Sequence, residues 1–144
     1  MMNEIVATLY DRLFDWNTYQ ELSGMVFNNQ DYGKLGWVLI IVPILTLTVF
    51  YKFWDPVSSS KLKWFLSLLL VMIISYTGTS IILYNNFEII QYIGNYTGES
   101  GEPSADYFIF QMSVITLVYA LVLSIILSVI PFRLVSTNNR YNPF

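Results

Sequence analysis

The chain contains, from Phe108 to Phe132, the stretch FIFQMSVITLVYALVLSIILSVIPF, which has no charged residue. Gln111 is its only strongly polar member. A helix of about 25 residues, rising about 1.5 Å per residue, reaches roughly 37 Å, which exceeds the roughly 30 Å hydrocarbon core of a bilayer. The stretch therefore predicts a helix that spans a membrane.

One face of this predicted helix collects its small and hydroxyl-bearing residues. They recur at helical spacings of three or four along the stretch: Ser113, Thr116, Ala120, Ser124 and Ser128. In lipid, a stripe of small residues lets a second helix approach closely, and its hydroxyl groups can bond across the gap. We expect this stripe to be a helix-packing interface.

The composition of the whole chain agrees with a membrane protein of one domain. Of its 144 residues, 55% are hydrophobic and only 12% are charged, with a mean hydropathy of +0.52. A soluble domain carries roughly 25% charged residues. The net charge of −3 argues against a nucleic-acid partner. The sequence has no Cys and no His, which removes the commonest metal ligands and the commonest general base, so we expect no cofactor.

Two further spans are expected before this one. Trp37 and Trp54 bracket the first as an aromatic belt would, and Pro103 with Asp106 is typical of the start of the third. The expected spans are about 36–54, 62–84 and 103–131. The fold class predicted is an all-α integral membrane protein, with three transmembrane helices in 35–132 and an amphipathic helical segment before them. Between the second and third spans, the segment 87–93 is apolar enough to lie at the interface.

The second span contains an unusually polar hexad, Ser75-Tyr-Thr-Gly-Thr-Ser80. Hydroxyl groups in a helix can bond back to their own carbonyls. They can instead bond across a helix interface, with Gly78 allowing close approach. We favour the second interpretation and assign Ser75, Gly78 and Thr79 to a packing interface, while a water-filled lining is the third alternative.

The N-terminal segment 1–34 is mixed in character. Val6, Leu9, Leu13 and Trp16 fall at helical spacing, with charged residues on the other face. Thr18 and Glu21 have the spacing of a capping box, which predicts a second short helix ending near Phe27. The first helix either lies on the membrane surface or a partner, or covers the protein's own helices.

Basic residues near the ends of the spans predict the orientation. Five fall on one side: Lys52, Lys61, Lys63, Arg133 and Arg140. Arg12 and Lys34 fall on the other side, and the loop 85–107 has no basic residue. By the positive-inside rule, the N-terminus lies outside and the short tail 133–144 lies in the cytoplasm of a bacterial inner membrane. Lys52, Lys61, Lys63 and Arg133, together with Trp37 and Trp54, are expected to anchor the chain at the lipid headgroups.

No ionisable residue lies in the middle of a span, which argues against a pump or an ion-coupled transporter. No catalytic constellation is present, so an enzyme is not expected. Three helices bury little surface, so stripes of small and polar residues indicate further transmembrane subunits besides the lipid bilayer. We expect a structural subunit of a larger bacterial envelope complex, for example the inner-membrane base of a secretion or contractile injection apparatus. The alternative is a homo-oligomeric, holin-like pore.

Overall fold

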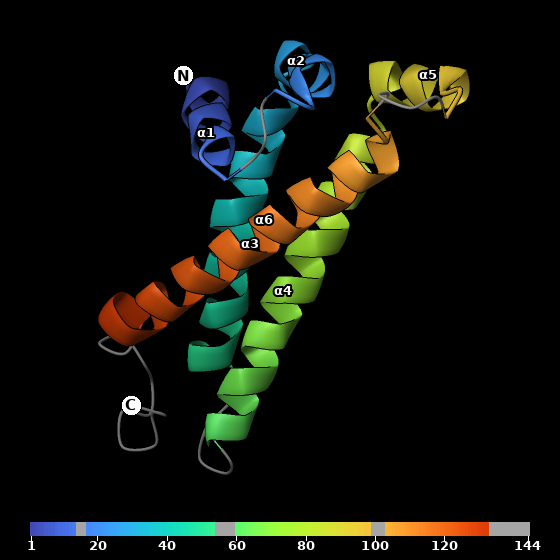
Figure 1. Cartoon of the computed structure of the whole chain (residues 1–144). Helices are drawn as coiled ribbons and strands as arrows, with labels where there is room; N and C mark the ends of the chain where they lie inside the picture. Colours follow the sequence, from blue (N-terminus) through green and yellow to red (C-terminus); the bar gives the residue numbers. More distant parts are fainter. Residues whose placement is uncertain (14–16, 54–59, 99–102, 133–144) are drawn as a thin grey trace. The chain divides into compact units, whose positions relative to one another are not determined.

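A computed structural model of the chain describes residues 1–13, 17–53, 60–98 and 103–132. All of its regular elements are helical (Figure 1). In chain order they are α1 (Met2–Asp11), α2 (Gln20–Asn28), α3 (Asp31–Lys52), α4 (Ser60–Tyr84), α5 (Phe87–Asn95), α6 (Ala105–Leu127) and the short π-helical segment η1 (Ser128–Phe132).

Three of these helices are long and apolar enough to cross a membrane. The candidate spans are Asp31–Lys52, Lys61–Tyr84 and Ala105–Ile130, with mean hydropathies of 2.0, 2.1 and 2.6. This confirms the predicted fold class: the chain is an all-α integral membrane protein with three candidate transmembrane helices, preceded by short N-terminal helices.

The helix boundaries differ from the predicted ones in two places. The first span begins at Asp31 rather than near 36, so the boundary predicted at 34 falls inside α3. The helix continues into polar residues because the Asp31 carboxylate is buried and hydrogen-bonded there. The third span begins at Ala105, two residues after Pro103.

The short helices also correct the sequence analysis. The N-cap residue of α2 is Tyr19, one residue after the predicted Thr18, and the Tyr19 side chain makes no capping bond. The apolar segment after the second span forms a helix, α5, for which the sequence analysis predicted no secondary structure. Its cap is Asn86, whose side-chain oxygen accepts from the backbone N–H groups of Glu88 and Ile89.

The chain divides into two compact units. The first comprises Met1–Val38 and Tyr76–Thr116, which include α1, α2 and α5 and one end of each long helix. Aromatic rings lie in its interior: Tyr10 packs edge-on against Tyr32 with ring centroids 5.8 Å apart, and Tyr19 lies 5.6 Å from Phe108.

The second unit comprises Leu39–Ser75 and the described part of Leu117–Phe144. Its core contains Leu47, Phe50 and Tyr51, with Trp64 and Leu127 packed against them. Phe50 and Tyr51 meet edge to face at 4.7 Å between ring centroids. Helices α3, α4 and α6 all contribute to this core, so it joins all three spans.

Candidate functional site

The stripe of small residues on α6 and η1 lies in the interior of the protein. All five of its members have no exposed surface: Ser113, Thr116, Ala120, Ser124 and Ser128. In the first unit, the Ser113 hydroxyl bonds to the Ser80 hydroxyl of α4 at 2.9 Å. The Thr116 hydroxyl bonds to the Tyr10 hydroxyl of α1. The Ser124 hydroxyl donates to the Ala120 carbonyl of its own helix, at 2.7 Å.

Ser128 joins three helices in the second unit. Its hydroxyl lies 2.6 Å from the hydroxyl of Tyr51 on α3, and it accepts a 2.8 Å hydrogen bond from the indole N–H of Trp64 on α4. The stripe thus finds hydroxyl and indole partners on α1, α3 and α4 of the same chain. It needs no second protein to cover it, which removes one reason for expecting further subunits.

The three positions of the α4 hexad that were assigned to a packing interface have different surroundings. The side chains of Ser75 and Thr79 are fully buried, and neither hydroxyl oxygen has a hydrogen-bond partner among the described residues. Gly78 faces Val38 of α3, and a Cβ atom added there would stand 3.8 Å from the nearest methyl carbon. This is an ordinary van der Waals separation, so close helix approach does not require the glycine.

The helix that does require a glycine is α3, at Gly36. A Cβ atom there would lie 2.7 Å from Cγ2 of Val6 and 3.3 Å from Met2 on α1. At Gly33, one turn earlier, a Cβ atom would meet no described residue within 4 Å. The Val6 and Met2 side chains of α1 therefore pack directly on the α3 backbone at Gly36.

The short helices α1, α2 and α5, which we call the cap, are held to the long helices by polar side chains. The Asp31 carboxylate, fully buried at the start of α3, accepts from the Asn86 amide at 2.6 Å, from the Asn29 amide at 3.2 Å and from the ammonium of Lys34. Because Asn86 also caps α5, one side chain joins α5 to α3.

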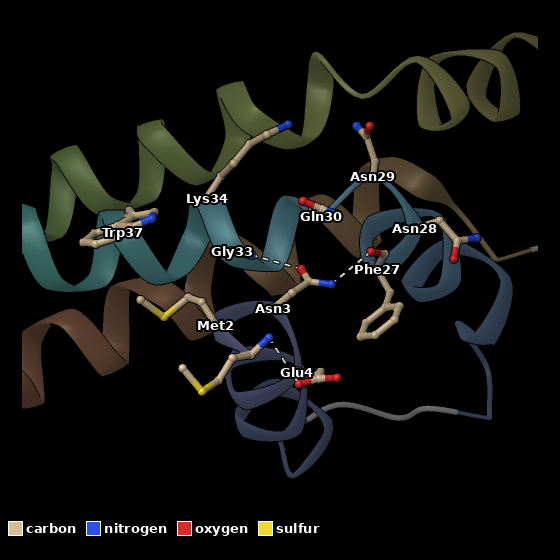
Figure 2. A pocket seen from close by; sticks show the side chains of 11 residues that line it. Met2, Asn3, Glu4, Phe27, Asn28, Asn29, Gln30, Gly33, Lys34 and Trp37 are labelled. Carbon is tan, nitrogen blue, oxygen red and sulfur yellow. Dashed lines mark hydrogen bonds and ion pairs between the residues drawn. The ribbon is translucent and has the colours of Figure 1, made fainter.

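A second polar contact holds α1. The Asn3 side chain donates to the Phe27 carbonyl at the end of α2, at 3.0 Å, and accepts from the Gly33 N–H of α3, at 3.1 Å. Figure 2 shows Asn3 between these two backbone groups, at the edge of a pocket. This pocket has a volume of about 710 Å³, and carboxamides dominate its polar lining: Asn3, Asn28, Asn29 and Gln30. Lys34 and Trp37 also line it.

A second pocket, of about 650 Å³, lies between α2 and α5. Glu21 and Gln91 line it, together with Tyr92 and Tyr96. The cap therefore contributes to two polar pockets in the first unit. Each pocket is lined by carboxamide, carboxylate and aromatic side chains that can contact a partner.

The predicted headgroup anchors lie at or near the ends of the spans. Trp37 is 56% exposed near the start of α3, and Lys52 is exposed at its end. Lys61 is exposed and Lys63 half-buried in the first turn of α4. Trp54 and Arg133 lie outside the described residues, as do Trp16 and the tail 133–144.

No group of three or more metal-ligating side chains is found among the described residues. The residues that the sequence analysis missed are the partners of the stripe, Tyr10, Tyr51 and Trp64, and the pair Asp31 and Asn86. All except Tyr10, which lies in α1, are polar groups near the ends of the long apolar helices. No family model, no curated protein and no solved structure matches this chain.

Proposed function

We propose that this chain is a non-catalytic structural subunit of a multi-subunit membrane complex, in which the cap docks a partner. A bacterial envelope complex, such as the inner-membrane base of a secretion or contractile injection apparatus, is the setting that we favour. The observation that carries this proposal is the cap itself: two polar pockets on short helices that hydrogen-bonding side chains hold in place.

The chemistry of the pockets suits a protein partner. Carboxamide side chains carry both donors and acceptors, so those of Asn28 and Gln30 in the first pocket can pair with the peptide groups of another chain. Trp37, Tyr92 and Tyr96 add the aromatic surface that is enriched at protein interfaces. Because the cap is already fixed to α3, docking on it costs little ordering entropy.

The hydroxyl stripe favours the scaffold function rather than the pore function. A homo-oligomeric pore needs a polar face directed away from its own chain, to line the lumen. Here the stripe residues are buried, and three of their hydroxyl groups bond to other helices of the same chain. The exposed large side chains of α6 and η1 beyond Phe110 are instead apolar: Val118, Val122, Ile125, Ile126, Val129 and Ile130.

The experiment is purification of the tagged chain from its native membrane in mild detergent, with measurement of the mass and composition of the complex. A scaffold subunit brings partners in a fixed ratio. Asn28→Arg in the first pocket and Gln91→Arg in the second should reduce that ratio, because each places a large charge where a partner docks. Gln20→Arg is the matched control, since Gln20 is exposed on α2 and lines neither pocket.

A ring of this chain alone, together with ion leakage in cells that express it, would favour the pore. Partners that remain in the same ratio with all three arginine variants would show that the cap is not the docking surface. The two results are distinguishable, because the first concerns which proteins make up the purified complex and the second concerns whether substitutions in the pockets change the partner ratio.

A further inference from the structure

Helix α1 has three distinct sectors around its axis. One sector is buried in the protein: Val6, Ala7 and Tyr10. A second sector is polar and exposed: Glu4, Thr8, Asp11 and Arg12. The third sector, which we call the apolar sector, is exposed although its side chains are large and apolar: Ile5 is 57% exposed, Leu9 37% and Leu13, in the turn after α1, 58%. Ile5 and Leu9 are four residues apart and lie on one side of α1. Leu13 follows in the turn after the helix, and we refer to these three residues as the row.

The contacts of the buried sector show which parts of the spans α1 lies beside. Val6 packs on Gly36, the sixth residue of the span that begins at Asp31. Tyr10 bonds to Thr116, the twelfth residue of the span that begins at Ala105. Helix α1 thus lies beside residues of two candidate spans.

Helix α3 also exposes large apolar side chains. Trp37, Ile40 and Ile41 are 56%, 37% and 44% exposed. On a candidate membrane span, such side chains face lipid. Trp37 marks the interfacial level, where tryptophan is enriched in membrane proteins, and it lines the same pocket as Glu4 of α1.

We propose that α1 is an in-plane membrane helix whose apolar sector, Ile5, Leu9 and Leu13, contacts the acyl chains of one leaflet. Its polar sector then faces the headgroups and water, which is the arrangement that a helix with apolar and charged faces adopts at an interface. The occupant of this surface is lipid, because the row is apolar and α1 packs on Gly36 of a candidate span. This inference does not depend on the proposed docking function of the cap, because it concerns a different sector of α1.

The chain has no cysteine, so single-cysteine variants label at one position only. Ile5→Cys and Leu13→Cys report the apolar sector. Thr8→Cys, exposed one turn from Glu4 in the polar sector, is the matched control, and Ile41→Cys on α3 is the lipid reference. Each full-length variant is labelled with a nitroxide in phospholipid vesicles. Its collision rate is then measured with oxygen, which concentrates in lipid, and with a water-soluble nickel chelate.

The labels at Ile5 and Leu13 should show an oxygen-to-nickel ratio close to that of Ile41 and several-fold higher than that of Thr8. A ratio equal to that of Thr8 would place the row in water and overturn the proposal. Low collision rates with both reagents and an immobilised spectrum would mean that protein covers the row, which also overturns it. Dilution with unlabelled chain then shows whether that protein is a second copy.

Native membranes give an independent readout. A charged maleimide reacts with thiols in water and not with thiols within lipid. Thr8→Cys should react in intact membranes, while Ile5→Cys should react only after detergent denaturation. Equal reaction of the two variants in intact membranes would overturn the proposal for the protein in its natural setting.

Discussion

The Asn86 side-chain amide donates a 2.6 Å hydrogen bond to the buried Asp31 carboxylate, 55 residues away in sequence. Asp31 is the first residue of α3, and Asn86 follows the end of α4. The amide therefore fixes the ends of two antiparallel spans to each other. Its carbonyl oxygen at the same time accepts hydrogen bonds from the backbone N–H groups of Glu88 and Ile89 in α5. One side chain positions both the hairpin and the cap.

We expect Asn86→Ala to lower the free energy of unfolding by about 3 kcal/mol, because it removes both a hydrogen bond to a charged group and a helix cap. Asn86→Asp separates the two roles: Asp caps helices well but places a second carboxylate against Asp31. We expect it to be as damaging as Asn86→Ala. The measurement is unfolding in mixed micelles with increasing anionic detergent, and Asn85→Ala, at an exposed neighbour, should be within about 0.5 kcal/mol of wild type. A stable Asn86→Asp variant would mean that residue 86 contributes to stability only by capping the N-terminus of α5.

Gly36 and Gly33 lie one turn apart on α3 and should respond oppositely to alanine. Gly36→Ala forces a Cβ atom against the stiff, β-branched Val6, so we expect a loss of about 1–3 kcal/mol. The Cβ atom added by Gly33→Ala meets no described neighbour, and alanine loses less backbone entropy than glycine in a helix. We therefore expect the free energy of unfolding to rise by about 0.5–1 kcal/mol. Val6→Ala combined with Gly36→Ala should recover part of the loss. Equal effects of the two single variants in the same unfolding measurement would contradict close packing of α1.

Two serines of the stripe should differ in their response to loss of the hydroxyl. Ser124 bonds to a carbonyl of its own helix, so Ser124→Ala should change the free energy of unfolding by no more than a few tenths of a kcal/mol. Ser128→Ala deprives both Tyr51 and Trp64 of a partner and should cost more, up to about 1.7 kcal/mol. Trp64 fluorescence should shift in the second variant alone. Identical behaviour of the two variants would mean that the three-helix contact at Ser128 is not maintained in lipid.

Enlarging the stripe should be more harmful than truncating it. Ser124 has no exposed surface, so Ser124→Leu must displace a neighbouring helix and should cost about 1–3 kcal/mol. Ile126→Leu is the control, because Ile126 is 49% exposed on the same helix and the change conserves volume. The yield of folded protein in mild detergent measures both. Equal yields would mean that Ser124 does not pack against the protein in the membrane.

The orientation is tested with reporters. A cytoplasm-active reporter fused after Phe144 should be active, and one inserted at Gly94 should be inactive, because the positive-inside rule places the basic ends of the spans in the cytoplasm. The reverse pattern would overturn the charge argument and place the cap in the cytoplasm. Reporter activity normalised to protein level is the measurement.

The three spans could be predicted because lipid requires long uncharged runs, and such runs are unambiguous in a sequence. The buried stripe could also be located, since small residues at helical spacing on an apolar span indicate a packed face. Its partners could not be predicted, because Tyr51 and Trp64 reach Ser128 across 77 and 64 residues, and no local pattern encodes such pairings.

The orientation of α1 shows a second limit. Spacing placed Val6, Leu9 and Leu13 on one apolar face, but only Val6 of these three is buried. The buried sector instead centres on Tyr10, whose hydroxyl finds Thr116. In a membrane protein both the interior and the lipid are apolar, so hydrophobic periodicity does not distinguish them. The sequence analysis missed helix α5 because its nine residues give too short a periodic pattern. Its N-cap residue, Asn86, was also not recognised as a helix start.

The position of Ser128 near the end of α6 has a consequence for biosynthesis. Tyr51 and Trp64 leave the ribosome 77 and 64 residues before the serine that joins them. The first two spans therefore enter the membrane without their shared hydrogen-bond partner and acquire it only when translation has almost passed the last span. A chain truncated before Ser128 would still insert its hairpin but would lack this closing contact. Membrane proteases that sense loosely packed helices could then recognise the incomplete product and spare the finished one.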